Sequence, residues 1–183
     1  MFHFNIITNL VKRYALVAAI AALAGCGAAQ DNTTTTATTT TAANAASSIN
    51  GESIIRGDAS NWLSNGRTYD EQRHSPLDQI NLENVDDLSL AWYWNTGTKR
   101  GLESTPIVVD GIMFNSGAWS MVWAHDAKTG ELLWEFDPQV DRAWARYACC
   151  DVVNRGVAAW KGKIYIGTID GRLIALDLSL IHI

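Results

Sequence analysis

The chain has 183 residues, and its 14 Lys and Arg against 19 Asp and Glu give a net charge of −5 at neutral pH. This length suits one ordinary domain. The acidic balance, with no basic stripe, disfavours binding to the phosphate backbone of nucleic acid. No glycine-rich nucleotide loop is present. The four histidines, which show no metal-ligand spacing, are His3, His74, His125 and His182.

The first 26 residues have the pattern of an export signal. Lys12-Arg13 precedes an apolar run from Tyr14 to Ala24, shorter than the roughly 20 residues that span a membrane. The run ends in Leu23-Ala24-Gly25-Cys26, which resembles the lipobox of bacterial lipoproteins. The resemblance implies a signal peptide over residues 1–25, lipid on Cys26, and a periplasmic protein anchored to a membrane. Gly27, in place of an aspartate, favours the outer membrane. An ordinary secretory signal with an incidental cysteine is the alternative.

Residues 26–50 are dominated by Ala and Thr, including the run from Thr33 to Thr36. From residue 27 to residue 48 there is no large apolar side chain, so nothing offsets the entropy lost on ordering. The composition predicts a disordered tether over residues 26–50, followed by the folded part over residues 51–177.

Short apolar segments alternate with Gly and Asp turns from Leu88 onward, which is typical of an all-β fold. Leu88 to Trp92 alternates with period two and predicts a strand. Ile107 to Phe114 predicts two strands joined at Asp110-Gly111, a pair that favours primed hairpin turns. Residues 61–79 show no helical stripe and are expected to wrap the edge of the domain.

An internal repeat of 51 residues separates Gly111 from Gly162, and each glycine is followed 13 residues later by an alanine, Ala124 or Ala175. Four-stranded repeats of roughly 40–50 residues are the signature of β-propeller blades. Ala124 to Trp134 resembles the tryptophan-docking motif of quinoprotein propellers, in which the Trp packs between neighbouring blades. An antiparallel sandwich is the alternative explanation.

Eight tryptophans are present in this short chain. Trp92, Trp134 and Trp160 fall in or beside predicted strands and are expected in the core. Trp119 and Trp123 are expected at a blade edge, and no tryptophan is assigned to a cofactor.

Two cysteines are adjacent in the sequence, Cys149 and Cys150. Adjacent Cα atoms lie about 3.8 Å apart, below the usual disulfide range of about 4.4–6.8 Å. A bond between the two would close a strained ring, and such strain often occurs at functional sites. Two buried free thiols, which behave as small apolar side chains, are the alternative.

The run ACCDVVNRGVA from Ala148 to Ala158, with RGLESTP from Arg100 to Pro106, resembles the quinoprotein alcohol dehydrogenases, which use pyrroloquinoline quinone (PQQ). The resemblance extends from about residue 62 to residue 177 and includes RTYDEQRHSPLDQI at 67–80. It implies an eight-bladed β-propeller, of which this chain holds the first one to two blades. It also implies oxidation of small alcohols to aldehydes with PQQ and Ca²⁺, with electrons passing to a cytochrome c.

The same resemblance assigns site residues. It implies that Cys149 and Cys150 form a disulfide lying flat against one face of the quinone. It further implies that Glu103 and Arg155 hydrogen-bond the cofactor and that Val153 belongs to the cofactor-binding set. Without the motifs, Glu103 and Arg155 would be interpreted as a solvated ion pair on a turn. The catalytic aspartate and the calcium ligands are expected in later blades, so this chain alone is expected to be inactive.

The last six residues, Leu178 to Ile183, depart from the repeat, which predicts a Thr-Gly turn and a Trp at this point. They resemble the translation of a transposase adapter used in sequencing libraries, which implies a segment foreign to the protein. The competing hypothesis for the whole chain is a non-catalytic propeller lipoprotein of outer-membrane assembly. That class shares the lipobox and the repeat but does not explain ACCDVVNRG.

Overall fold

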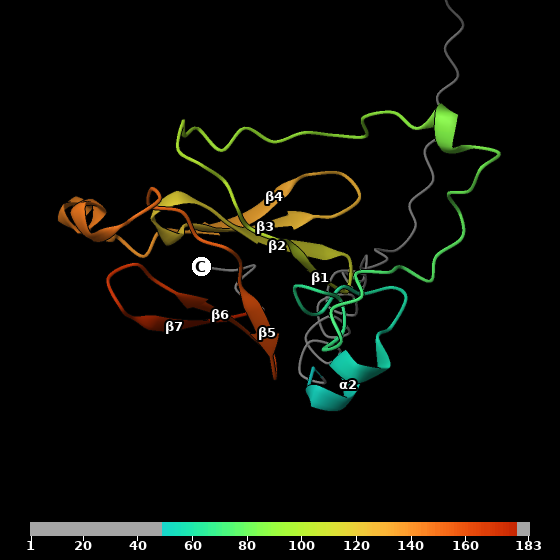
Figure 1. Cartoon of the computed structure of the whole chain (residues 1–183), viewed down its shortest axis with the longest axis horizontal. Coiled ribbons are helices and arrows are strands. Elements are labelled where there is room, and N and C mark those ends of the chain that lie inside the picture. The colour runs from blue at the N-terminus through green and yellow to red at the C-terminus, as the bar shows by residue number, and fades with distance from the viewer. Residues whose placement is uncertain (1–48, 179–183) are drawn as a thin grey trace, which may run out of the picture. The chain divides into compact units, whose positions relative to one another are not determined.

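Two antiparallel β-sheets form the body of the computed structural model, which describes residues 49–178 (Figure 1). The first sheet has four strands in chain order: β1 (Ile107–Val109), β2 (Ile112–Ser116), β3 (Val122–Asp126) and β4 (Leu132–Phe136). The second has three: β5 (Ala158–Trp160), β6 (Lys163–Gly167) and β7 (Leu173–Asp177). Sequential antiparallel strands in one sheet are the arrangement of a propeller blade. The described residues therefore comprise one four-stranded blade and three strands of a second.

Short helices occupy the connections: α2 (Gly51–Arg56), and the 3-10 helices η1 (Val85–Asp87), η2 (Ala118–Ser120) and η3 (Arg142–Tyr147). Helix α2 begins at a capping box, in which the Asn50 side chain accepts from the backbone N–H of Ser53, and the Ser53 hydroxyl accepts from that of Asn50. No helix among residues 49–178 is long and apolar enough to cross a bilayer. The signal peptide, Cys26, most of the tether and residues 179–183 lie outside the described residues.

The two sheets begin with the same hairpin turn. Asp110 and Gly111 have φ of 50° and 78°, and Lys161 and Gly162 have φ of 45° and 78°. Positive φ at both central residues is the type I′ turn, whose twist matches that of the strands it joins. The turn predicted at Asp110-Gly111 is confirmed, and the 51-residue repeat places its equivalent in the second sheet.

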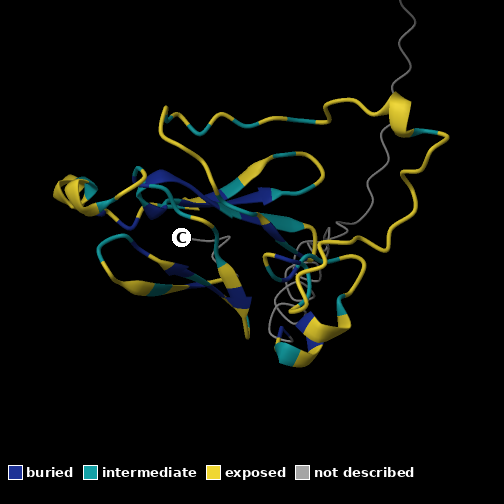
Figure 2. Ribbon diagram, in the orientation of Figure 1, coloured by how far each residue is buried: buried dark blue, intermediate teal, exposed yellow. Residues whose placement is uncertain are grey.

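One hydrophobic core joins both sheets, and the dark blue positions of Figure 2 lie largely on their strands. Phe114 and Val122 from the first sheet and Ile164 from the second are fully buried. Trp134 is 8% exposed, and its ring centroid lies 5.9 Å from that of Phe114. Burying each such side chain contributes about 1.5–3 kcal/mol, so the contact between the sheets is a main source of stability. The prediction that Trp134 packs in the core is confirmed.

The strand predicted at Leu88 to Trp92 is wrong. These residues form no strand, and Leu88 and Leu90 are 60% and 77% exposed. A strand needs a neighbour to satisfy its backbone groups, and none of the described strands pairs with this segment. A period-two pattern does not tell whether a partner strand is present.

Two tryptophans differ from their expected positions. Trp160 is 36% exposed because it lies on β5, at the edge of its sheet. Trp123 is 3% exposed because β3 lies between β2 and β4. The edge-wrapping prediction holds at Trp62, whose backbone N–H and C=O both bond Val108 of β1 at 2.9 Å.

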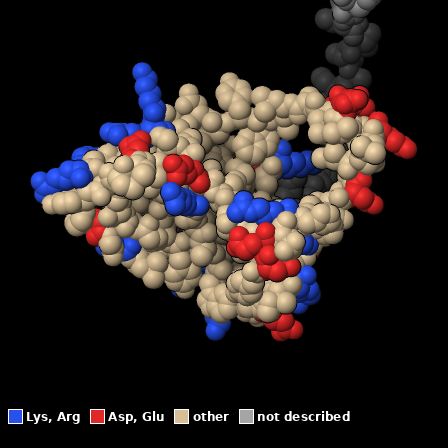
Figure 3. Space-filling model, viewed as in Figure 1, with Lys and Arg blue, Asp and Glu red and all other residues tan. Residues whose placement is uncertain are grey.

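Charges of both signs are interspersed on the face shown in Figure 3.

Candidate functional site

The adjacent cysteines lie on the loop that runs from η3 to β5. Both are exposed free thiols, which contradicts the alternative of two buried ones. Their Sγ atoms lie 2.7 Å apart, and the hydrogen bond and the charge of Cys149 raise the pKa of the Cys150 thiol. The disulfide between them stays a prediction.

A second pair of residues comes together from two distant loops. Arg155 Nε lies 3.2 Å from Glu103 Oε2, across a sequence separation of 52 residues. The side chains are 79% and 43% exposed, so the ion pair faces open space. Exposed ion pairs contribute little to stability, and the binding of a ligand by this pair stays a prediction.

Asp151 connects the same two loops. Its carboxylate accepts from Arg100 Nη1 at 2.6 Å and from the backbone N–H of Gly101 at 3.3 Å. A hydrogen bond from the Val152 N–H, together with these two groups, lowers the pKa of Asp151. The backbone of Asp151 has φ of 75°, a left-handed conformation that non-glycine residues rarely adopt. The loop is therefore held directly beside Cys150.

Backbone contacts complete the attachment of the loop. Thr105 N–H donates to the Arg155 carbonyl at 3.3 Å, and Trp119 N–H donates to the Val152 carbonyl at 2.9 Å. Gly156 has φ of 141°, and a Cβ there would lie 3.2 Å from the Thr105 carbonyl oxygen. Only glycine fits this close approach without strain.

The loop and the end of β6 enclose an open hollow of about 300 Å³. It is lined by Ala148, Cys149, Cys150, Asp151, Val153, Asn154, Arg155, Gly167, Thr168 and Ile169. Of the residues predicted from the sequence, Cys149, Cys150, Val153 and Arg155 therefore line one hollow. Glu103 is joined to it through the ion pair with Arg155.

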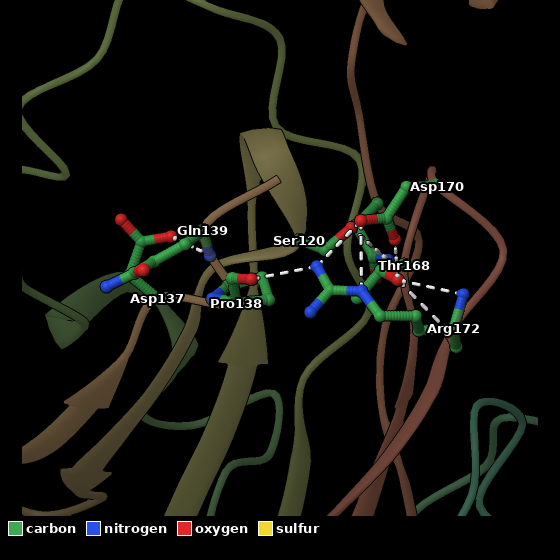
Figure 4. A network of polar contacts seen from close by, with 8 residues as sticks. Ser120, Asp137, Pro138, Gln139, Thr168, Asp170 and Arg172 are labelled. Carbon is green, nitrogen blue, oxygen red and sulfur yellow. Dashed lines mark hydrogen bonds and ion pairs between the residues drawn. The ribbon is translucent and has the colours of Figure 1, made fainter. Parts of the chain in front are cut away.

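Thr168, which lines the hollow, belongs to a polar network (Figure 4). The Thr168 hydroxyl hydrogen-bonds Asp170, and Arg172 Nε donates to Asp170 at 2.9 Å. Arg172, followed by Thr168, lowers the pKa of Asp170 to about 2. Arg172 Nη2 also donates to the Pro138 carbonyl at 2.8 Å, which connects the second sheet to the segment after β4.

Sequence reasoning missed Asn154, although it lies inside the ACCDVVNRG motif. Its amide group makes hydrogen bonds to both sheets, with Ser116 Oγ at 2.7 Å and with the Gly167 carbonyl at 2.9 Å. An asparagine between a cysteine pair and an arginine carries no distinctive spacing, so only the fold could identify it. Among residues 49–178, no group of three or more His, Cys, Asp or Glu could hold a metal ion.

Together the two sheets define a class of protein, the β-propellers, whose blades are sheets of sequential antiparallel strands. The chain belongs to the family described as "PQQ: Glucose/ethanol/alcohol dehydrogenase, beta-propeller domain", whose model matches residues 62–179. The propeller prediction and the suspected family are thereby confirmed, and the sandwich alternative is wrong.

Similar proteins include quinohemoprotein alcohol dehydrogenase ADH-IIG of Pseudomonas putida, 56% identical over 131 residues, which are 70% of this chain and 18% of that protein. The dehydrogenase subunit of alcohol dehydrogenase (quinone) from Acetobacter aceti is 49% identical over 168 residues, 91% of this chain and 22% of that one. The crystal structure of quinohemoprotein alcohol dehydrogenase from Comamonas testosteroni superposes with a TM-score of 0.72 at 52% identity, covering 77% of this chain and 21% of that chain. The chain thus spans about a fifth of the length of these relatives.

Proposed function

We propose that this chain is the N-terminal part of a quinoprotein dehydrogenase that oxidises small alcohols to aldehydes with PQQ and passes the electrons to a cytochrome c. The observation that carries the proposal is the hollow lined by Cys149, Cys150 and Arg155, with Glu103 ion-paired at its rim. The names of the relatives support the substrate class. One of them is a 1-butanol dehydrogenase (cytochrome c) of Thauera butanivorans, 47% identical over 116 residues.

The residues present fit a flat, anionic quinone. The Arg155 guanidinium is exposed and can donate hydrogen bonds to carboxylate or quinone oxygens, a charge-assisted type of contact. Glu103 accepts from Arg155 and so fixes the direction of that guanidinium. The two Sγ atoms, 2.7 Å apart, add exposed, polarisable sulfur to the same hollow. When bound, PQQ would supply the two-electron acceptor for alcohol oxidation.

The disulfide between Cys149 and Cys150 is part of the proposal. The Sγ atoms already lie 2.7 Å apart, and both thiols are exposed to an oxidant. Forming the bond removes two protons and two electrons, which the thiol oxidants of an exporting bacterial compartment accept. Mass spectrometry of the full-length protein should then find both cysteines on one peptide that is lighter by two hydrogens.

Calcium is proposed from the family resemblance alone, because residues 49–178 contain no candidate ligand cluster. One structural neighbour is a europium-containing methanol dehydrogenase, with a TM-score of 0.65 and 38% identity over 70% of this chain. Reconstitution of the full-length protein should therefore compare Ca²⁺ with a lanthanide ion. Activity with Ca²⁺ is the expected result, and activity with the lanthanide alone would contradict it.

The experiment that tests the function starts from the full-length protein prepared without cofactor. PQQ is titrated in, and alcohol-dependent reduction of a dye or of cytochrome c is measured. We expect Arg155→Ala to weaken PQQ binding about 10- to 100-fold, because hydrogen bonds to charged groups contribute about 1.5–3 kcal/mol. Arg73→Ala is the matched control, since Arg73 forms an exposed ion pair with Glu71 outside the hollow. Absence of PQQ binding by the unaltered protein would favour the non-catalytic propeller instead.

The location of the protein is proposed from the lipobox. We propose a periplasmic protein that lipid on Cys26 anchors to a membrane, the outer membrane being favoured. Several acyl chains anchor a protein stably, whereas a single chain binds marginally. Cys26→Ala should therefore release the protein into the soluble periplasmic fraction. Retention of the variant in the membrane fraction at the level of the unaltered protein would refute the anchor.

A further inference from the structure

The Asn154 side chain makes four hydrogen bonds. Its Oδ1 accepts from Ser116 Oγ at 2.7 Å and from the Gly156 N–H at 3.1 Å. Its Nδ2 donates to the Gly167 carbonyl at 2.9 Å and to Ser120 Oγ at 3.5 Å. These partners belong to the end of β2, to η2, to the end of β6 and to the loop itself. One amide group thus ties the loop to both blades.

The same network reaches the loop of Glu103. Ser116 Oγ lies 3.2 Å from Ser104 Oγ, and Ser104 Oγ accepts from the Ser116 N–H at 3.1 Å. Ser116 is fully buried, so these bonds are protected from water. Ser104 follows Glu103 in the chain, and Asn154 precedes Arg155. The two residues proposed to bind the cofactor are therefore connected through their neighbours by a continuous line of hydrogen bonds.

Three residues around this line have a strained backbone conformation. Trp119, Ser120 and Asp151 all have positive φ, of 64°, 60° and 75°. Non-glycine residues hold such conformations only where the surrounding structure over-determines them, and they cluster at functional sites. Asn154 bonds the side chain of Ser120, and the neighbouring Val152 carbonyl accepts from the Trp119 N–H.

We propose that Asn154 is a positioning residue of the cofactor site. Its amide sets the distance between Glu103 and Arg155 and holds Cys149 and Cys150 at the surface of the hollow. This inference rests on the proposed function for its PQQ readout. The reactivity of the cysteine pair supplies a second readout that does not require the cofactor.

The test compares Asn154→Asp with the unaltered full-length protein. Aspartate has the same shape and keeps the two acceptor bonds, but it cannot donate to Gly167 or Ser120. We expect PQQ affinity to fall about tenfold or more, since the loss of two donated bonds, one of which leaves the Gly167 carbonyl unpaired, is at least of that order. After reduction, the rate at which iodoacetamide alkylates Cys149 and Cys150 should also change severalfold. Ser116→Ala removes the contacts of its hydroxyl with Asn154 and Ser104 but only one of the four Asn154 bonds, and it should shift both readouts in the same direction, by less.

Asn61→Asp is the matched control. Asn61 Oδ1 accepts from the Asp110 N–H at 2.7 Å, at the opposite end of β2. Aspartate keeps this acceptor but loses the side-chain hydrogen bonds to the Asp58 and Asp110 carboxylates and adds a like charge beside them, so this exchange also loosens a loop. It should lower the melting temperature and leave PQQ affinity and alkylation rates unchanged. If Asn154→Asp changes neither readout, or changes them no more than Asn61→Asp at equal loss of stability, Asn154 is only structural. If the unaltered protein binds no PQQ, the proposed function fails, and the alkylation rates still decide whether Asn154 positions the cysteines.

Discussion

The two blades begin alike and then differ. Their hairpins share the same turn, but β3 is buried at four of its five residues, whereas β7 is buried only at Leu176. The two strands are equivalent in the 51-residue repeat, in which Ala124 corresponds to Ala175 and Asp126 to Asp177. Strand β3 lies between two neighbours, and β7 has one. The burial of a blade strand is therefore set by its neighbours as much as by its own residues.

The candidate site depends on both blades. Its hollow is lined by the loop between the sheets and by the end of β6, and Asn154 also reaches the end of β2. Four experiments, in order of decreasing expected effect, test how far the blades differ.

The largest effect is expected at Trp134, which has no equivalent within the described part of the second blade. Trp134→Ala removes a buried ring that packs on Phe114, and such changes cost about 3–5 kcal/mol. Urea unfolding of the full-length protein measures the loss. Trp160→Ala is the control, because this ring is 36% exposed and its removal should cost about 1 kcal/mol or less. Equal losses would refute the assignment of Trp134 to the core between the blades.

The second experiment converts a residue of the first blade into its equivalent in the second, His125→Leu. His125 is 2% exposed, lies against Trp94 with ring centroids 4.7 Å apart, and has no hydrogen-bond partner on either ring nitrogen. Replacing this unpaired polar group should stabilise the protein by about 1 kcal/mol at neutral pH.

The same exchange should change the pH dependence of stability. Burial lowers the pKa of His125, so the unfolded chain binds the proton more readily than the folded one. The free energy of unfolding is unaffected by this proton binding above the unfolded pKa of about 6.5, and it declines as the pH falls below that value. Melting temperatures from pH 8 to pH 5 should therefore decline less in His125→Leu. Parallel curves would show that His125 does not contribute.

The third experiment lowers the pH to test the interaction of Asp170 with Arg172, whose side chain also bonds the Pro138 carbonyl after β4. The pKa of Asp170 is lowered to about 2, so its contribution is present above the unfolded pKa of about 3.9 and is lost as the pH falls toward 2. Arg172→Leu removes the main cause of the lowered pKa and the bond to Pro138. The variant should be less stable at pH 6 and should lose less stability between pH 4 and pH 2. Arg73→Leu, at an exposed ion pair, should leave the acid profile unchanged.

The smallest effect is expected at the second hairpin turn. Lys161 has φ of 45°, where asparagine is favoured, whereas the first turn already has Asp110. Lys161→Asn should stabilise the protein by about 0.5 kcal/mol, measured by thermal unfolding. Lys128→Asn is the control, because Lys128 lies in an exposed turn without positive φ and should give no gain. Destabilisation by Lys161→Asn would indicate that the contact of Lys161 with the Trp160 ring matters more than the turn.

Local chemistry made much of the fold predictable. The turn at Asp110-Gly111 could be predicted because few other residues adopt positive φ, and the 51-residue repeat gives the equivalent position in the second blade. The resemblance to the quinoprotein alcohol dehydrogenases also named the cysteine pair, Glu103 and Arg155 as candidate site residues, because the runs from Arg100 to Pro106 and from Ala148 to Ala158 match motifs of that family. Such features act within a few residues, and the chain displays them directly.

Only the tertiary structure decided which side chains meet. Leu88 to Trp92 has the alternation of a strand, yet it has no partner among the described strands and is not one. Trp160 was expected in the core and is exposed, whereas Trp123 was expected at a blade edge and is buried, because their neighbours in the sheets determine burial. The ion pair of Arg155 with Glu103, and the bonds of Asn154 to β2 and β6, join residues that the sequence holds far apart. Hydrogen bonds and burial depend on distance in space, so these parts of the site followed from the packing of one blade on the next.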